Sequence, residues 1–108
     1  MKQFFNIING QEVKSTNTFL SRNSSNLSDV IGEFPIATKD QLREACRAAR
    51  AAFLIWGKTP APIRGEVIGN IGRAIAREKE TLSQLLSREM GKTLKEARGD
   101  VQEAIDTC

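Results

Sequence analysis

The side chains that could do chemistry in this chain are two cysteines, Cys46 and Cys108, and several carboxylates near the C-terminal end. The sequence contains no histidine, so no Cys–His or Ser–His–Asp arrangement can form, and zinc sites with imidazole ligands are excluded. The two cysteines are too few and too far apart for a disulfide framework. Cys46 falls on an apolar helical stripe, where a free thiol usually behaves as a small hydrophobic side chain, whereas the role of the terminal Cys108 is open.

The carboxylates could supply an acid–base pair or a cation site. Asp100 and Glu103 share one face of a predicted helix. Lys95 and Arg98 lie close by, and solvated carboxylates with basic neighbours are commoner than a pre-formed cation site. The residues themselves therefore favour an exposed, solvated surface for the whole set: Glu89, Glu96, Asp100, Glu103 and Asp106.

Three glycines, Gly65, Gly69 and Gly72, invite comparison with a phosphate-binding loop. A dinucleotide fingerprint needs its glycines in the turn between a strand and a helix. These glycines instead follow a proline and sit inside helical periodicity, where their spacing places them on one face. We expect that face to pack closely against a neighbouring element.

The elements that position these residues begin with strands and turns in residues 1–36. Phe4 to Ile8 and Gln11 to Lys14 flank Asn9-Gly10, a strong signal for a tight hairpin turn. A second strand is expected at Thr18 to Arg22, and a third at Asp29 to Phe34 before Pro35.

Helices are expected over residues 38–57, 62–90 and 93–108. Thr38 with Gln41, and Thr93 with Glu96, have the spacing of capping boxes. The middle helix is long, and its apolar stripe thins near Arg77 to Glu80, where a kink is expected. Gly91 should end that helix in a left-handed conformation. Trp56, at the end of the first apolar stripe, is expected to be a core anchor.

Composition narrows the function classes. The net charge is +3 and charged residues make up 27% of the chain, but both halves mix acidic with basic residues, so no basic face for nucleic acid is expected. No apolar run approaches the roughly 20 residues that a bilayer needs, and the N-terminus does not read as a signal peptide. A cytoplasmic location is favoured, and the length of 108 residues suggests at most one domain.

Several stretches occur in the order and spacing of one known family. The chain resembles the N-terminal segment of the NAD(P)-dependent aldehyde dehydrogenases. The stretches that carry the resemblance are spread along nearly the whole chain: residues 5–13, 29–35, 48–56, Glu89-Met90-Gly91-Lys92 and the following residues 93–100.

The resemblance implies an α/β parent fold, in which this segment is an N-terminal hairpin with short strands followed by three to four amphipathic helices of the cofactor-binding domain. It implies oxidation of an aldehyde or semialdehyde to a carboxylate through a thiohemiacetal and a thioester on a cysteine. In that family the acting cysteine, the glutamate and the strands that contact the cofactor lie further along the chain. NAD or NADP would therefore serve the parent enzyme, and neither is expected to bind this chain alone.

The resemblance also implies roles for individual residues. In some members the aspartate at the position of Asp100 holds a structural monovalent cation together with backbone carbonyls before the Asn23 turn, which suggests Asp100 and Arg22 as ligands. Gly99 and Glu103 would line the tunnel through which the aldehyde reaches the nucleophile.

The expected partners are the remainder of the parent polypeptide and further copies in a homo-oligomer. On this interpretation the chain is an N-terminal fragment that is inactive alone. The alternative is a stand-alone helical module whose amphipathic faces bind a partner protein without catalysis.

Overall fold

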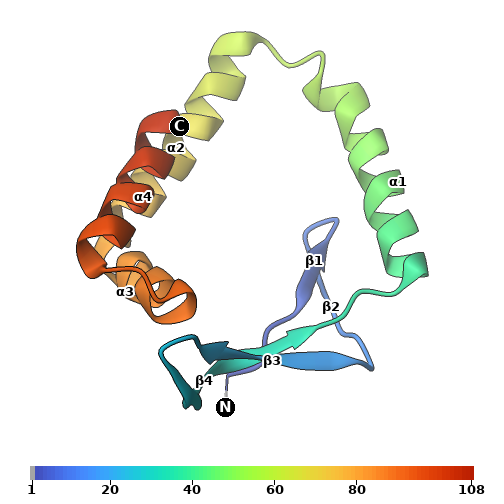
Figure 1. The fold of residues 1–108 in the computed structure, drawn as a ribbon. Coiled ribbons are helices and arrows are strands. Elements are labelled where there is room, and N and C mark those ends of the chain that lie inside the picture. The colour runs from blue at the N-terminus through green and yellow to red at the C-terminus, as the bar shows by residue number, and fades with distance from the viewer. Residues whose placement is uncertain (1) are drawn as a thin grey trace. The chain divides into compact units, whose positions relative to one another are not determined.

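A computed structural model describes residues 2–108 (Figure 1). Short strands come first and four helices follow. No helix in this described range is long and apolar enough to cross a membrane. The elements are β1 (Asn6–Ile8), β2 (Gln11–Val13), β3 (Thr18–Asn23), β4 (Asn26–Pro35), α1 (Lys39–Trp56), α2 (Ala61–Arg77), α3 (Lys79–Met90) and α4 (Leu94–Thr107).

Although the length suggests at most one domain, the described residues group into two compact units. The first unit contains the residues up to Arg22 together with Val30–Thr59. The second contains Asn23–Asp29, at the turn between β3 and β4, together with Pro60–Cys108. The candidate residues on the last three helices therefore belong to the second unit.

The first unit begins with the predicted hairpin. β1 and β2 pair antiparallel, with Ile8 opposite Gln11. Asn9 and Gly10 connect them with φ values of 51° and 74°. Both residues tolerate positive φ, which is what a tight turn that matches the twist of its strands requires. The hairpin prediction is confirmed.

A small aromatic cluster provides the packing near β4. The rings of Phe4 and Phe34 stack with centroids 4.5 Å apart, and the Phe19 ring lies 5.7 Å from that of Phe34. The backbone of Phe4 donates to the carbonyl of Glu33 at 2.9 Å. Gly32 is buried beneath this cluster, and an added Cβ would lie 2.5 Å from the Phe4 ring. A glycine is therefore required for the close approach of the Phe4 ring.

Helix α1 starts at the predicted capping box. The Gln41 amide donates to the Thr38 hydroxyl at 3.2 Å, and the Thr38 amide donates to the Gln41 side chain at 2.9 Å. Gln41 also donates from Nε2 to the carbonyl of Lys14 at 2.7 Å, which ties the start of α1 to the end of the hairpin. Gly57 ends the helix with a right-handed φ of −64°, so this helix end does not depend on a left-handed glycine.

The apolar stripe of α1 is less covered than the sequence suggests. Its alanines, among them Ala45, Ala49 and Ala52, face Ile7 and Ile8 of β1 across a shallow cavity of about 240 Å³. No residue of α1 is buried. A three-residue strand covers only the small side chains, so the predictions of a packed Cys46 and a core Trp56 are wrong for this chain. Cys46 is exposed, and 40% of the Trp56 surface remains accessible.

In the second unit, the predicted kink is a complete break. α2 ends at Arg77, α3 begins at Lys79, and Glu78 lies between them with φ −102° and ψ 11°. The prediction of a discontinuity at this charged stretch is confirmed.

Helices α3 and α4 pack closely through small residues. Ser83 and Ala97 have no exposed surface, and Val101 is 7% exposed. The Ser83 hydroxyl donates to the carbonyl of Lys79 at 2.6 Å, so this buried polar group is satisfied within its own helix. Two charged residues bind across the helices as well: Lys79 donates to Gln102 at 2.6 Å, and Arg98 donates to Glu80 at 2.8 and 2.9 Å.

The glycines of α2 differ in their surroundings. A Cβ on Gly72 would lie 2.8 Å from Cβ of Cys108 and 3.4 Å from the carbonyl oxygen of Ile105. Gly65 has no such neighbour within 4 Å, and Gly69 has only Arg73 of its own helix at 3.5 Å. The expectation of close packing against a neighbour is thus confirmed for Gly72 and wrong for Gly65 and Gly69, because α4 ends beside only one of the three glycines.

The junction of α3 and α4 follows the sequence prediction. Gly91 has φ 75° and ends α3, with its amide donating to the carbonyl of Ser87 at 2.8 Å. Thr93 and Glu96 then form the second capping box. A left-handed glycine followed by a cap reverses the chain so that α4 packs against the helices before it.

Candidate functional site

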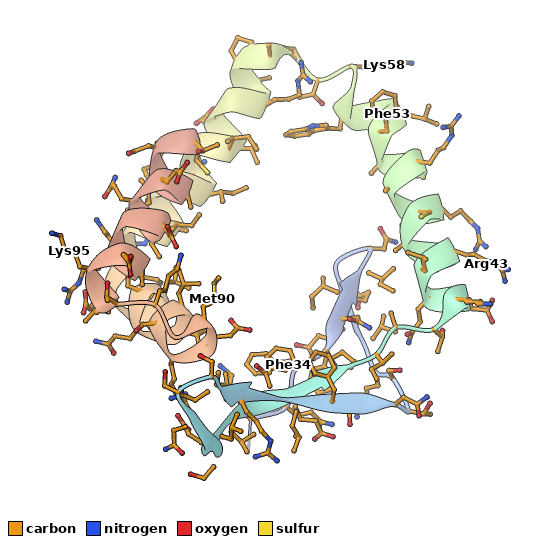
Figure 2. All side chains as sticks on the ribbon, viewed as in Figure 1. Phe34, Arg43, Phe53, Lys58, Met90 and Lys95 are labelled. Atoms are coloured by element: carbon orange, nitrogen blue, oxygen red, sulfur yellow. The ribbon has the colours of Figure 1, made fainter. Side chains whose placement is uncertain are left out.

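Helix α4 carries three of the four residues that the resemblance singles out, namely Gly99, Asp100 and Glu103. Ala97 and Val101 are buried, and they mark the face of α4 that packs against the other helices of its unit. Lys95 extends away from the other two helices of this unit (Figure 2). The cap at Thr93 fixes where the helix starts, and with it the direction in which each candidate side chain points.

Gly99 and Glu103 lie one turn apart on the exposed side of α4. A Cβ on Gly99 would meet no heavy atom within 4 Å, so the surface there is open. Glu103 is exposed, and its carbonyl accepts a hydrogen bond from the Thr107 hydroxyl at 2.8 Å. This face is accessible, and its role as the wall of a substrate tunnel stays a prediction.

Asp100 lies on α4, at the edge between the exposed side of this helix and the side that packs against the other helices of its unit. Its carboxylate accepts a hydrogen bond from the ammonium group of Lys92, in the segment between α3 and α4. The Lys92 carbonyl in turn accepts from the Ser87 hydroxyl at 2.8 Å, which holds this segment against the end of α3. Asp100 therefore already has a cationic partner within its own unit.

The predicted cation ligands Arg22 and Asp100 belong to different units. Among residues 2–108, no group of three or more Cys, Asp or Glu side chains is arranged to hold a metal ion. A site built from backbone carbonyls and a single carboxylate is a different kind of site, and it stays a prediction.

An apolar groove lies between the last three helices, next to Asp100. Its volume is about 430 Å³. Almost all of its wall is apolar, and Asp100 contributes the charged group at its margin. We refer to it as the three-helix groove, and it is lined by Ile75, Leu82, Leu86, Asp100, Val101 and Ala104.

A second polar feature of this unit was not predicted. Arg88 on α3 binds the carboxylate of Asp29 with two hydrogen bonds, and Asn23 donates to the same carboxylate at 3.0 Å. Chiefly through the hydrogen bond from Arg88 and then that from Asn23, the pKa of Asp29 is lowered from its usual 3.8 to about 2. No local pattern signals a pair so distant in the chain, so only the fold reveals it.

The three glycines that resemble a phosphate-binding loop do not form a turn suited to a dinucleotide. Gly65, Gly69 and Gly72 all lie within α2, so their backbone amides take part in the hydrogen bonding of the helix. A phosphate-binding turn needs these amides free at a helix N-terminus. These three glycines are therefore not a phosphate-binding turn, and no chemical step through a nicotinamide cofactor is assigned to this chain.

Comparisons with known proteins give a consistent result. The model of the aldehyde dehydrogenase family matches residues 12–108. The chain is 42% identical over 101 residues to aldehyde dehydrogenase family 7 member A1 of Pisum sativum, covering 94% of this chain and 20% of that protein. It is 38% identical over 103 residues to malonate-semialdehyde dehydrogenase 1 of Shouchella clausii, covering 94% of this chain and 21% of that protein.

A solved structure gives the same match in three dimensions. The NAD-dependent aldehyde dehydrogenase from Sinorhizobium meliloti superposes with a TM-score of 0.91 and 26% identity, over 97% of this chain and 22% of that one. The chain thus spans about a fifth of the length of the relatives that it matches.

Proposed function

Because the chain belongs to the aldehyde dehydrogenase family, we propose that it forms the N-terminal part of an NAD(P)+-dependent enzyme that oxidises an aldehyde or semialdehyde to a carboxylate. The observation that carries this proposal is the match of the family model over residues 12–108. The name of the Sinorhizobium meliloti relative supports NAD as a cofactor of the parent enzyme.

The chain's own part in this function is to position rather than to react. The proposed tunnel wall is the side of α4 where Gly99 leaves an open surface and Glu103 is exposed. A glycine there leaves room for a substrate, and a carboxylate one turn away would favour uncharged or cationic aldehydes over anionic ones. The proposed cation site joins Asp100 to backbone carbonyls near Arg22.

The chain alone is proposed to be inactive and to bind no nicotinamide cofactor, because the resemblance places the acting cysteine, the glutamate and the strands that contact the cofactor further along the polypeptide. The proposed partners are the rest of such a polypeptide and further copies of it in a homo-oligomer. The proposed compartment is the cytoplasm.

A fusion protein tests the proposal. This chain replaces the matching N-terminal region of malonate-semialdehyde dehydrogenase 1 of Shouchella clausii, which supplies the rest of the polypeptide. Aldehyde-dependent reduction of NAD+, followed by absorbance of the reduced cofactor, should be restored by the fusion and absent from either part alone. A soluble, folded fusion that shows no turnover would count against the proposed function.

A second candidate is the stand-alone interaction module. The observation that favours it is the exposed apolar end of α1, where Phe53 is 67%, Leu54 65% and Ile55 75% exposed. Such side chains mark contact surfaces when they gather on one region. A module would bind a partner through this end while the fusion stays inactive, so the same fusion separates the two candidates.

A further inference from the structure

The turn that joins β1 and β2 (Figure 1) holds an asparagine directly before a glycine, a pair that the proposed function does not use. Asn9 and Gly10 are both exposed. In the part of the chain that the structure describes, the side-chain amide of Asn9 makes no hydrogen bond. A Cβ added to Gly10 would meet no atom within 4 Å. The amide carbon of Asn9 is therefore accessible, and the backbone nitrogen that follows it belongs to a residue without a side chain.

The other asparagines of the chain differ from Asn9 in the residue that follows. A side chain at that position restricts the backbone rotation that brings its nitrogen to the asparagine, most of all when the side chain is β-branched. Asn23 precedes a small serine, but it donates to Asp29 at 3.0 Å and accepts from the Ser25 amide at 2.9 Å, so two hydrogen bonds hold its side chain. The residues that follow the other asparagines are Ile7, Thr18, Ser24, Leu27 and Ile71.

The closed hairpin keeps the two groups of the turn apart. Asn9 has φ 51° and Gly10 has φ 74°. In the left-handed conformation the next amide nitrogen points away from the side chain. A reaction between the two groups therefore requires the backbone at Asn9 to rotate, which means that the hairpin opens. β1 and β2 contain three residues each, and a two-stranded hairpin is only marginally stable by itself, so local opening is accessible.

Contacts with α1 oppose this opening. Gln41 donates from Nε2 to the carbonyl of Lys14 at 2.7 Å, directly after β2. Ile8 of β1 lies against the alanines of α1, among them Ala45 and Ala49. The population of the open hairpin therefore depends on how firmly α1 holds the two strands.

We propose that Asn9 is a site of spontaneous deamidation and that opening of the β1–β2 hairpin sets its rate. The Gly10 nitrogen forms a bond to the side-chain amide carbon of Asn9, and the bond from that carbon to the side-chain nitrogen breaks. The proton of the Gly10 nitrogen passes by way of solvent to the departing NH2 group, which leaves as ammonia. Water then hydrolyses the five-membered succinimide at either carbonyl and gives aspartate or isoaspartate. Nothing is oxidised or reduced, and water is the co-reactant.

Either product changes the hairpin. Asn9 shares a shallow cavity of about 480 Å³ with Glu44 and Arg47 of α1, so a carboxylate at position 9 adds a negative charge beside an existing ion pair. Isoaspartate also adds a methylene group to the main chain, which disturbs the pairing of Ile8 with Gln11. The proposal does not depend on the proposed function, because every group it uses belongs to the first unit.

Peptide mass spectrometry of the chain kept in mildly alkaline buffer tests the proposal. Fragment ions locate the replacement of NH2 by OH at each asparagine, and an isoaspartate-specific methyltransferase detects the rearranged product. We expect Asn9 to be modified before Asn23 in the folded chain. Urea should speed the modification of Asn9 by at least about tenfold, because unfolding abolishes the closed turn.

Gln41→Glu tests the role of hairpin opening. Glutamate still accepts the hydrogen bond from the Thr38 amide, so the cap of α1 is kept, but it cannot donate to the carbonyl of Lys14. Modification of Asn9 in the folded variant should be faster than in the parent chain by about threefold or more, the effect of one lost hydrogen bond. Gln84→Glu makes the same change of charge in the second unit and should leave the rate at Asn9 unchanged.

The measured rates either support or overturn the proposal. Faster modification in Gln41→Glu than in Gln84→Glu, with equal rates for both variants in urea, would support control by the hairpin. Modification of Asn23 before Asn9 in the folded chain would overturn the assignment of the site. Equal rates at Asn9 in the folded parent chain and in urea would overturn the role of opening. Far-ultraviolet circular dichroism shows whether each variant keeps its helices, and the comparison of Asn9 with Asn23 needs no variant.

Discussion

Arg88 and Asp29 lie 59 positions apart in the sequence and bind each other through two hydrogen bonds, one of them 2.7 Å long from Nε to Oδ2. The guanidinium group presents its donors as a planar fork that matches a carboxylate, so this geometry fixes orientation as well as distance. Asn23 donates a third hydrogen bond to the same carboxylate. The turn between β3 and β4 is thereby attached to α3 within one compact unit.

The first prediction concerns low pH. The pKa of Asp29 is lowered from 3.8 to about 2, so the folded state binds this proton less readily than the unfolded state. The stabilisation is complete above the unfolded value and is lost as pH falls from about 4 to about 2. Asp29→Asn should lower the urea midpoint at about pH 5, and the difference from the parent chain should shrink at about pH 2.5.

Asp106→Asn is the matched control for this experiment. Asp106 accepts one hydrogen bond from Gln102 at 2.8 Å on the exposed side of α4, in the same unit as Asp29. An amide oxygen can accept that bond as well, so little change is expected at either pH. Equal destabilisation by Asp29→Asn at both pH values would contradict the prediction.

The local part of the fold is readable from the sequence because its causes are local. The Asn9-Gly10 turn, the Thr38 and Thr93 caps and the break after Arg77 each depend on residues within a few positions of one another. The burial of a side chain, by contrast, depends on which distant parts of the chain pack against it. Trp56 and Cys46 have the periodicity of a core stripe, yet a short hairpin cannot cover them.

The second prediction concerns the left-handed residue between α3 and α4. Gly91 has φ 75°, and a Cβ there would lie 2.6 Å from the Ser24 hydroxyl oxygen. Gly91→Ala should destabilise the chain by about 1–2 kcal/mol, because a side chain disfavours this conformation by that amount. Urea unfolding followed by circular dichroism measures the effect.

Gly99→Ala serves as its counterpart. Gly99 lies inside α4, and a Cβ there meets nothing within 4 Å. Alanine in a helix interior is favoured over glycine by about 0.5–1 kcal/mol, so this variant should be more stable than the parent chain. Opposite signs for the two substitutions are the expected result, and a stabilising Gly91→Ala would show that the left-handed turn is not required.

The third prediction concerns the contact between α2 and the end of α4. Gly72→Ala would place a methyl group 2.8 Å from Cβ of Cys108, so the last turn of α4 must move. We expect faster amide exchange at Ile105 and Thr107, measured by NMR. Gly65→Ala adds the same methyl group where no neighbour lies within 4 Å, and it should leave those amides unchanged.

The candidate site shows the same division between local and distant causes. The positions of Gly99 and Glu103 on an exposed helix face follow from the periodicity of α4, which a cap at Thr93 sets in register. The partner of Asp100 does not follow from that pattern. Lys92 reaches the carboxylate only because Gly91 turns the chain back toward the next helix, so the pair depends on the backbone between them.

The fourth prediction concerns self-association of the isolated chain. Phe53, Leu54 and Ile55 are each at least 65% exposed, and they follow one another just before the last residue of α1. Figure 2 labels Phe53 in this last turn. Three large apolar side chains in succession are poorly solvated, and association that removes them from water is favoured by the hydrophobic effect. Light scattering across a dilution series should therefore show a mass that rises with concentration.

The double variant Phe53→Ser with Ile55→Ser should weaken this dependence of mass on concentration. Arg43→Ser, on the charged part of the same helix, should leave it unchanged. A mass that stays at the monomer value for the parent chain at all concentrations would show that the exposed end of α1 does not drive association.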